Sequence, residues 1–216
     1  MKKASIFILF IVLILTIFIG TAFATPNEEI WIAIDPGHGG VDGGAVVNDI
    51  KEASLTLEIS FKIKEIFEQN GIHVLMTRET EDDLSQGNFV KREDMIHRVN
   101  TLNTSNACLA LSIHLNKFNI NKYRGAQVFY NTTNSCNLYL AQVMQQSLIT
   151  YLKNTDRKIV KRDNIFLLNK VTIPCCIIEC GFMSNPEEFA LLQSEEYQYK
   201  IAYALIYGVE DYLKLY

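Results

Sequence analysis

The sequence lacks long runs of charge of either sign. It contains 20 Lys and Arg residues against 24 Asp and Glu residues, which gives a formal net charge of −4 at pH 7. These charges are interspersed along the chain, so the basic patch of a nucleic-acid-binding protein is missing. We therefore expect no nucleic acid among the partners of this protein.

After about residue 28 the chain also lacks internal repeats, low-complexity tracts and linkers rich in Pro, Gly or Ser. This absence argues against appended binding or adaptor modules. The 216 residues, 49% of them hydrophobic, suffice for one globular domain with a sizeable core. We expect this single domain to span residues 25–216.

The cysteine pattern does not predict a disulfide framework. The five cysteines are an odd number, so at least one is unpaired or joined to another molecule. Cys175 and Cys176 are adjacent in an apolar run and Cys180 follows four residues later, a spacing unlike the C-x-x-C pairs of structural zinc sites. We interpret these three residues as buried small hydrophobes in preference to disulfide partners or metal ligands.

One long hydrophobic run is present, at the start of the chain. Two lysines precede residues 4–20, which are almost wholly apolar, and residues 21–24 (Thr-Ala-Phe-Ala) provide an Ala-x-Ala cleavage site. The pattern predicts an export signal over residues 1–24. Because the apolar segment is slightly long for a cleaved signal peptide and slightly short for a spanning helix, an uncleaved membrane anchor is the alternative. In both cases residues 25–216 lie outside the cytoplasm.

Hydrophobic periodicity predicts alternating strands and helices in the exported part. We expect strands at residues 30–34, 72–76, 107–113, 125–130, 165–168 and 173–179. We expect helices at residues 55–67, 90–104, 135–151, 186–192 and 194–213. This alternation predicts a single α/β domain with a mixed, mostly parallel sheet of about six strands and helices on both of its faces.

Residues able to bind a metal or transfer a proton are predicted at the ends of three strands. His38 follows the first strand in Asp-Pro-Gly-His-Gly-Gly, where Pro36 has no amide hydrogen to continue a ladder. His114 follows the third strand, and Glu179 closes the last one. Glu52 comes after a glycine-rich loop and just before the first helix, so its carboxylate can turn back beside His38. Strand ends of this kind commonly form the sites of α/β proteins.

Two imidazoles and one carboxylate are the usual ligand set of catalytic zinc, which leaves one position open for water. The set of His38, Glu52 and His114 therefore predicts a hydrolase. Glu179 is the candidate for the carboxylate that takes the proton of water and passes it to the leaving amine.

Each of these residues also has a structural interpretation. A histidine at a strand end is usually a hydrogen-bonded structural residue, and Glu52 alone could be a solvated residue in the first turn of a helix. His73 and His97 keep the structural interpretation, because neither lies near a comparable group of residues.

Several segments together resemble one known family, the zinc-dependent N-acetylmuramoyl-L-alanine amidases of bacterial cell walls. The resemblance rests on residues 35–40 (Asp-Pro-Gly-His-Gly-Gly), Glu52, residues 112–116 (Ser-Ile-His-Leu-Asn), residues 125–130 (Gly-Ala-Gln-Val-Phe-Tyr) and residues 178–186 (Ile-Glu-Cys-Gly-Phe-Met-Ser-Asn-Pro). It runs in order over nearly all of residues 30–213. The resemblance implies that His38, Glu52 and His114 hold one zinc ion and that Glu179 is the catalytic carboxylate.

Finer features resemble the sporulation-specific, CwlD-like branch of that family, which acts on spore cortex. These features are Leu115 directly after His114 and the Gly-Ala-Gln strand that begins at Gly125. The resemblance implies cleavage of the amide between the lactyl group of N-acetylmuramic acid and L-alanine, as the first step toward muramic lactam. It also implies action in the cell wall or the forespore intermembrane space.

Some members of the family carry a helical insertion that covers the zinc. Only about ten residues separate His114 from Gly125, which is too few for such a helix and its connections. Control of this enzyme would therefore come from its expression, its location or an accessory partner protein.

Two other functions stay open from the sequence. A peptidoglycan-binding scaffold or regulator would not require the two histidines and two glutamates, whereas a zinc peptidase acting within the stem peptide shares the metal chemistry. Arg78, Arg92 and Asn116 are candidate substrate contacts. A structural ion pair is the favoured interpretation for the two arginines, and for Asn116 a hydrogen bond to a loop backbone is an equal alternative.

Overall fold

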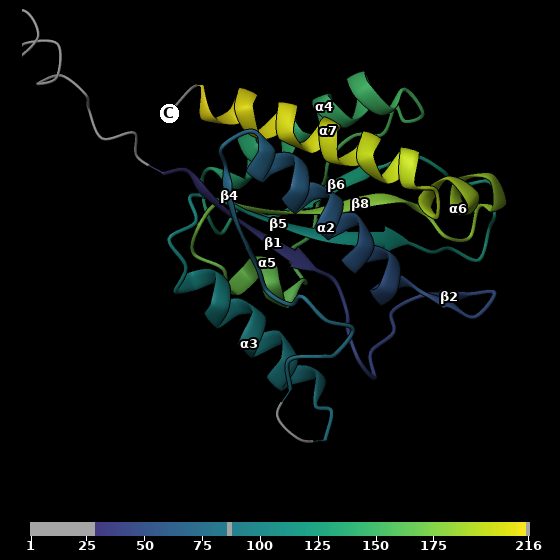
Figure 1. Cartoon of the computed structure of the whole chain (residues 1–216), viewed down its shortest axis with the longest axis horizontal. Coiled ribbons are helices and arrows are strands. Elements are labelled where there is room, and N and C mark those ends of the chain that lie inside the picture. Colours follow the sequence, from purple (N-terminus) through teal and green to yellow (C-terminus); the bar gives the residue numbers. More distant parts are fainter. Residues whose placement is uncertain (1–28, 86–87, 215–216) are drawn as a thin grey trace, which may run out of the picture.

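The computed structural model describes residues 29–85 and 88–214 (Figure 1). The expected export signal at residues 1–24, with its possible anchor at residues 4–20, lies outside the described residues. In the part of the chain that is described, no helix has both the length and the apolar character needed to cross a membrane.

A six-stranded sheet forms the centre of the molecule, in the order β4-β1-β5-β8-β6-β7. The ladders β4–β1, β1–β5, β5–β8 and β6–β7 are parallel, and the β8–β6 ladder is antiparallel. The predicted mixed, mostly parallel sheet is therefore confirmed. The strands are β1 (Trp31–Pro36), β4 (His73–Met76), β5 (Ala110–Asn116), β6 (Gln127–Tyr130), β7 (Val160–Lys161) and β8 (Cys175–Phe182). A separate small hairpin consists of β2 (Val46–Val47) and β3 (Ile50–Lys51).

Helices cover both faces of the sheet, as the sequence predicts. Figure 1 shows α2 (Glu52–Gln69), α4 (Asn137–Leu152) and α7 (Glu195–Leu213) on one side and α3 (Lys91–Asn103) and α5 (Phe166–Lys170) on the other. The short α6 (Pro186–Leu192) follows β8.

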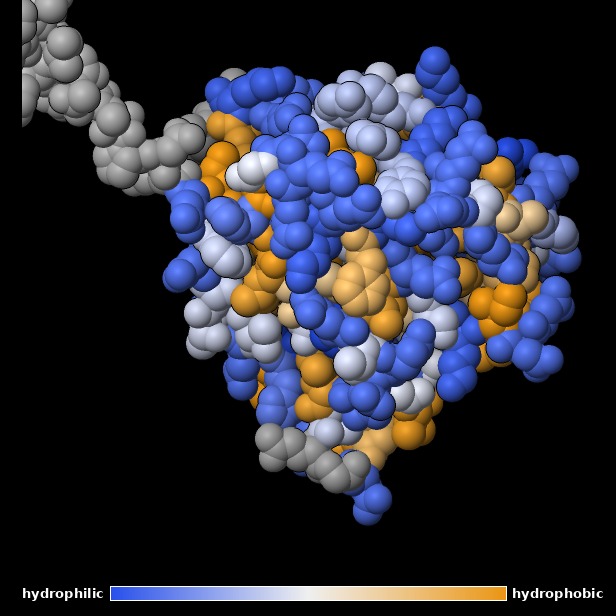
Figure 2. Space-filling view, in the orientation of Figure 1, coloured by the Kyte–Doolittle hydropathy of each residue, from blue (hydrophilic) through white to orange (hydrophobic). Residues whose placement is uncertain are grey.

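Successive residues of the central strands alternate between two hydrophobic clusters, because side chains of a strand point to opposite faces. Ile34, Leu111 and Ile178 belong to the larger cluster, whereas their neighbours Ala33, Ala110 and Ile177 belong to the smaller one. Hydrophilic residues cover most of the outer face seen in Figure 2, and hydrophobic ones appear between them in scattered patches. The apolar sequence runs are thus placed in two cores, one on each side of the sheet.

The predicted strand at residues 165–168 is wrong, because this segment begins helix α5. Leu167 and Leu168 are both buried, at 2% and 0% exposure, in the smaller hydrophobic cluster. A strand would point these adjacent side chains in opposite directions, whereas a helical turn lets both reach the same core. The edge of the sheet is instead formed by β7, five residues earlier in the chain.

The strands that carry His114 and Glu179 extend further than the sequence predicts. β1 continues two residues past its predicted end to Pro36, β5 continues to Asn116 and β8 continues to Phe182. His114 pairs directly with Glu179 in the β5–β8 ladder, and the register shifts between His114 and Asn116. Both residues therefore lie within paired strands, which fixes their side chains on one face of the sheet more firmly than a loop would.

Candidate metal centre

Three of the predicted site residues meet beyond β1. His38, Glu52 and His114 each offer one ligand atom, and these atoms all lie within 4.8 Å of one another. Glu52 Oε1 is 3.3 Å from His38 Nε2 and 3.1 Å from His114 Nδ1. Glu52, which is the first residue of α2, thus lies beside His38, as its position after the glycine-rich loop predicts.

Two glycines make room for this group. A Cβ atom on Gly37 would lie 2.3 Å from His114 Cε1, so the imidazole ring occupies the place of a side chain there. A Cβ atom on Gly44 would lie 2.7 Å from both His38 Cδ2 and Glu52 Oε2. His38 itself has a φ of 60°, in the left-handed region that few residues other than glycine adopt. The glycine-rich loop therefore serves close packing of the three side chains as well as chain reversal.

Neighbouring groups fix the orientation of the candidate ligands. His38 Nδ1 lies 3.1 Å from Asp42 Oδ1, and Lys91 Nζ lies 3.0 Å from the other oxygen of Asp42. The second His38 nitrogen, Nε2, is the one that faces Glu52. Carboxylate partners of this kind select the tautomer and the ring orientation of metal-binding histidines.

Backbone amides fix Glu52 in the same way. Ala45 N donates to Glu52 Oε2 at 2.9 Å and Leu115 N donates to Oε1 at 3.0 Å. Both carboxylate oxygens are therefore held from two different parts of the chain.

The electrostatics favour a negative Glu52 and a positive His114 when no cation is bound. Burial alone would raise the pKa of Glu52, but hydrogen bonds and charge from His114 and His38 outweigh burial and hold that pKa well below its usual range. Burial alone would lower the pKa of His114, but the hydrogen bond with Glu52 and the nearby carboxylates raise it. A cation bound to this imidazole nitrogen would compete with a proton for it.

Glu179 differs from Glu52 in lacking partners. It pairs with His114 across the ladder, and among the described residues its buried Oε2 atom has no hydrogen-bond partner. Burial raises the pKa of Glu179 to about 7, and the negative charge of Glu52 acts in the same direction against the lowering effect of His114. A carboxylate in this state can both accept and return a proton near neutral pH.

The donor set fits one divalent cation. Two imidazole nitrogens and one carboxylate oxygen converge with an uncommitted carboxylate beside them, which is the combination found at catalytic zinc sites. In residues 29–85 and 88–214 this is the only group of three or more His, Cys, Asp or Glu ligands that could hold a metal ion.

A cavity of about 240 Å³ opens beside the centre. Polar and charged side chains line one part of it, including Lys91, Asp94 and Arg98, and apolar side chains of the smaller core line another part. The lining includes Gly37, His38, Asp42, His114, Glu179, Met95, Phe129, Ile165, Leu167 and Ile177. The cavity therefore joins the candidate metal centre to an apolar wall on the same face of the sheet.

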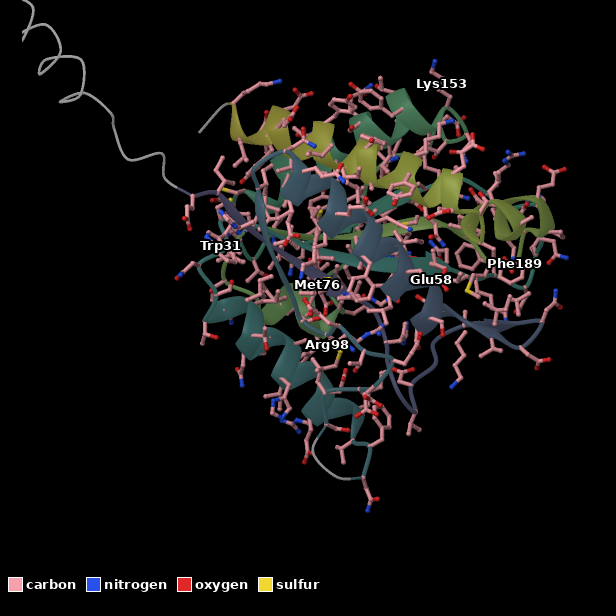
Figure 3. All side chains as sticks on the ribbon, in the orientation of Figure 1. Trp31, Glu58, Met76, Arg98, Lys153 and Phe189 are labelled. Atoms are coloured by element: carbon pink, nitrogen blue, oxygen red, sulfur yellow. The ribbon has the colours of Figure 1, made fainter. Side chains whose placement is uncertain are left out.

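A buried ionic network below the centre is not evident from the sequence. Arg98 Nη1 donates to Asp35 Oδ1 at 2.8 Å and to the carbonyl oxygen of Pro36 at 2.7 Å, and Nη2 donates to the carbonyl oxygen of His38. Its Nε donates to Asp94 at 2.7 Å. Figure 3 shows Arg98 between α3 and the sheet. The sequence signal for this network is Asp35, a carboxylate in an apolar strand that requires a buried partner.

Arg78 is a structural residue. It is 3% exposed, and its guanidinium donates to the carbonyl oxygens of Pro36, Gly37 and Ala53 at distances of 2.7 to 3.1 Å. Arg92 is exposed on α3, and Asn116 is half-buried with its Nδ2 atom unpartnered among the described residues. His73 stacks on Trp31 with ring centroids 4.7 Å apart, remote from the three ligands in the fold.

The cysteines agree with their interpretation as small hydrophobes. Cys175, Cys176 and Cys180 are fully buried, and Cys175 and Cys180 belong to opposite hydrophobic clusters. No two cysteines form a disulfide in the part of the chain that the structure describes.

Comparisons with known proteins agree on one family. A family model described as N-acetylmuramoyl-L-alanine amidase matches residues 32–211. The germination-specific N-acetylmuramoyl-L-alanine amidase of Bacillus subtilis (strain 168) is 40% identical over 186 residues, which cover 84% of this chain and 78% of that protein.

Solved structures show the same similarity. The CwlD amidase from Clostridioides difficile, solved in complex with the GerS lipoprotein, is 37% identical with a TM-score of 0.80, over 87% of this chain and 100% of that one. An N-acetylmuramoyl-L-alanine amidase from Clostridium difficile 630 is 30% identical with a TM-score of 0.78, over 87% of this chain and 98% of that one.

Proposed function

This chain belongs to the N-acetylmuramoyl-L-alanine amidase family, and from that membership we propose that its activity depends on one zinc ion held by His38, Glu52 and His114. We further propose that Glu179 is the catalytic carboxylate. The amidase activity on peptidoglycan follows from the family itself. The observation that supports the proposed roles best is the convergence of three ligand atoms within 4.8 Å beside a carboxylate oxygen that has no hydrogen-bond partner in the described part of the chain.

The scissile bond joins the lactyl carbonyl of N-acetylmuramic acid to the nitrogen of L-alanine. A zinc ion at this set supplies Lewis acidity, which polarises that carbonyl and makes water a better nucleophile at neutral pH. Glu179 takes a proton from the attacking water through its free Oε2 atom and delivers it to the alanine nitrogen as the C–N bond breaks. The products are a lactyl carboxylate and a stem peptide with a free L-alanine amino group.

The remaining contacts of the centre keep the ligand side chains and Glu179 in fixed positions for this reaction. Asp42 keeps the Nε2 atom of His38 turned toward the ligand group, and the amides of Ala45 and Leu115 keep Glu52 in place. Because Glu179 is paired with His114 in one ladder, the proton-transfer group and a ligand keep a constant separation.

The biological setting is proposed from the relatives. The B. subtilis relative is named as germination-specific, and the C. difficile relative is a CwlD amidase. We propose that spore cortex is the substrate of this chain and that an accessory protein assists it, since that CwlD amidase was solved with the GerS lipoprotein. The expected export signal is consistent with action outside the cytoplasmic membrane, in the cell wall or the forespore intermembrane space.

The test is to incubate the purified protein with zinc and muropeptides and to identify the products by mass spectrometry. We expect free stem peptide that begins with L-alanine. Cleavage inside the stem peptide would instead indicate a peptidase. Unchanged muropeptide with zinc bound, also after addition of an accessory protein, would indicate a binding role.

Variants separate the two proposed roles. Glu179→Gln is expected to keep stoichiometric zinc and to lose turnover, whereas His38→Ala and His114→Ala are expected to lose both. His73→Ala is the matched control, because its imidazole stacks on Trp31 outside the ligand group. Stoichiometric zinc in the two ligand variants would refute the ligand assignment.

A further inference from the structure

Arg162 is an exposed guanidinium that is held in place without a carboxylate partner. Its backbone amide donates to the carbonyl oxygen of Tyr130 at 2.7 Å, directly after the short edge strand β7. Its guanidinium carbon lies 4.9 Å from the centre of the Phe129 ring. In the described residues Arg162 forms no ion pair, and the adjacent Asp163 pairs with Lys161 at 3.2 Å.

Phe129 connects this cation to the reaction centre. The Phe129 ring lines the cavity that also contains His114 and Glu179, and Phe129 pairs with Ile177 in the β6–β8 ladder, two residues before Glu179. Arg162 thus lies outside the lining of the cavity and stacks on Phe129, a residue that lines it.

Other cations near the centre are already occupied. Lys91 pairs with Asp42 at 3.0 Å, and Arg98 pairs with Asp35 and Asp94. The Arg78 guanidinium donates its hydrogen bonds to backbone carbonyl oxygens. A guanidinium that stacks on an aromatic ring is pre-oriented, and it still offers a bidentate face to a planar anion. In contrast to Lys91, Arg98 and Arg78, Arg162 thus has a charge that no carboxylate of the described residues neutralises by an ion pair.

The chemistry of the substrate supplies such a carboxylate. The leaving group of the reaction is a peptide whose first side chain is the small apolar methyl of alanine and whose later residues carry free carboxylates. An apolar wall followed by an unpaired guanidinium matches that order of groups.

We propose that Arg162 is a specificity-determining residue that binds a carboxylate of the stem peptide while the alanine amide lies beside Glu179. This inference rests on the proposed roles of the centre, because they locate the reacting amide. Phe129 is the platform that positions the guanidinium, and the carboxylate is recognised on the leaving side of the scissile bond.

Steady-state kinetics on matched muropeptides test the proposal. One substrate carries free stem-peptide carboxylates, and its partners carry the same peptide amidated at the second residue, at the C-terminus, or at both. Arg162→Gln is expected to raise KM for the free-carboxylate substrate by about tenfold or more, with kcat changed less than about twofold, because a charge-assisted hydrogen bond is lost. For the substrate amidated at the recognised position, wild type and Arg162→Gln should have the same KM.

Controls separate recognition from general charge and folding effects. Lys200→Gln removes one exposed cation from α7, on the opposite face of the sheet from the cavity, and should leave all KM values unchanged. Arg162→Lys should recover part of the preference, and zinc content should equal that of wild type in every variant.

The outcomes distinguish this proposal from the proposed function. If wild type cleaves none of the substrates, the proposed function fails. If wild type cleaves them and Arg162→Gln changes KM equally for free and amidated substrates, or not at all, the role of Arg162 is refuted while the amidase centre stands.

Discussion

Gly37 has no side chain, and the ring of His114 occupies the space where one would be. We predict that Gly37→Ala pushes this ring away from Glu52, because the new Cβ atom would lie 2.3 to 2.6 Å from three ring atoms. Zinc affinity should fall by about tenfold or more, as for other disturbances of ligand orientation. Competition with a chromogenic chelator measures the affinity, and circular dichroism checks that the fold is retained.

Gly71→Ala is the matched control for this substitution. Gly71 has a φ of 77°, so alanine is strained there, but its Cβ atom would meet nothing within 4 Å. The Gly71→Ala substitution should lower the free energy of unfolding by about 1 kcal/mol without changing zinc affinity. Equal zinc affinity for Gly37→Ala and wild type would mean that the His114 ring is not held by this contact.

Glu179 gives a pH-dependent stability that does not depend on catalysis. Its folded-state pKa of about 7 lies above the ordinary value of 4.5, so the fold favours the protonated carboxyl. The metal-free protein should therefore lose stability as pH rises from about 4.5 through about 7. At pH 8 the pKa shift of Glu179 lowers the free energy of unfolding of the metal-free protein by at most about 3 kcal/mol.

The neutral amide in Glu179→Gln removes this titration. After both proteins are stripped of metal with a chelator, we expect Glu179→Gln to be more stable than wild type at pH 8. The difference in stability between the two proteins should be much smaller at pH 5. Urea unfolding at both pH values measures the difference. A gain of the same size at both values would show that Glu179 does not titrate in this range.

At the scale of elements, one side chain joins helix α3 to strand β1 and to the loop that carries His38. Arg98 is 2% exposed, and its removal would leave Asp35 charged and buried without its cation. We predict that Arg98→Met lowers the free energy of unfolding by about 3–5 kcal/mol, the usual cost of breaking a buried ion pair from one side. Urea denaturation is the measurement.

The same helix provides the control for this substitution. Arg92→Met changes an exposed arginine of α3, and its free energy of unfolding should stay within about 0.5 kcal/mol of the wild-type value. Similar losses for the two variants would indicate that α3 contributes through its packing and not through the ion pair.

The long elements could be predicted from the sequence because burial on both faces gives parallel strands continuous apolar runs. β1, β5 and β8 have this character, and the helices follow the 3.6-residue period. The two-residue strands β2, β3 and β7 have no such signal. Residues 165–168 resemble a strand in the sequence because an apolar run of four residues is too short to show either a helical or a strand periodicity. The segment is helical in the structure, where Leu167 and Leu168 are buried in the same hydrophobic cluster.

The candidate site was predictable to the extent that its residues stand out locally. His38, Glu52, His114 and Glu179 interrupt glycine-rich or apolar segments, so their types and positions single them out. Asp42 and Arg98 were missed, because their roles depend on partners brought together by the fold. The partner of Asp35 is 63 residues away, and no spacing rule links such a pair.

At the scale of the whole molecule, the proposed zinc ion joins three separate parts of the chain. These are the loop after β1, the start of α2, and β5. A cation bound only by the folded state stabilises the fold by mass action, by about 2.7 kcal/mol when its free concentration is 100 times Kd. For a domain of this size, such a contribution corresponds to a change of about 5–10 °C in Tm.

We therefore predict that EDTA lowers the Tm of the zinc-loaded protein by about 5–10 °C and that added zinc restores it. His114→Ala should have a low Tm that EDTA does not change, because the ligand set is incomplete without its nitrogen. His73→Ala keeps the set intact and should respond to EDTA as wild type does. Thermal unfolding followed by fluorescence gives all three values, and an equal EDTA effect on His114→Ala would mean that the stabilising cation binds elsewhere.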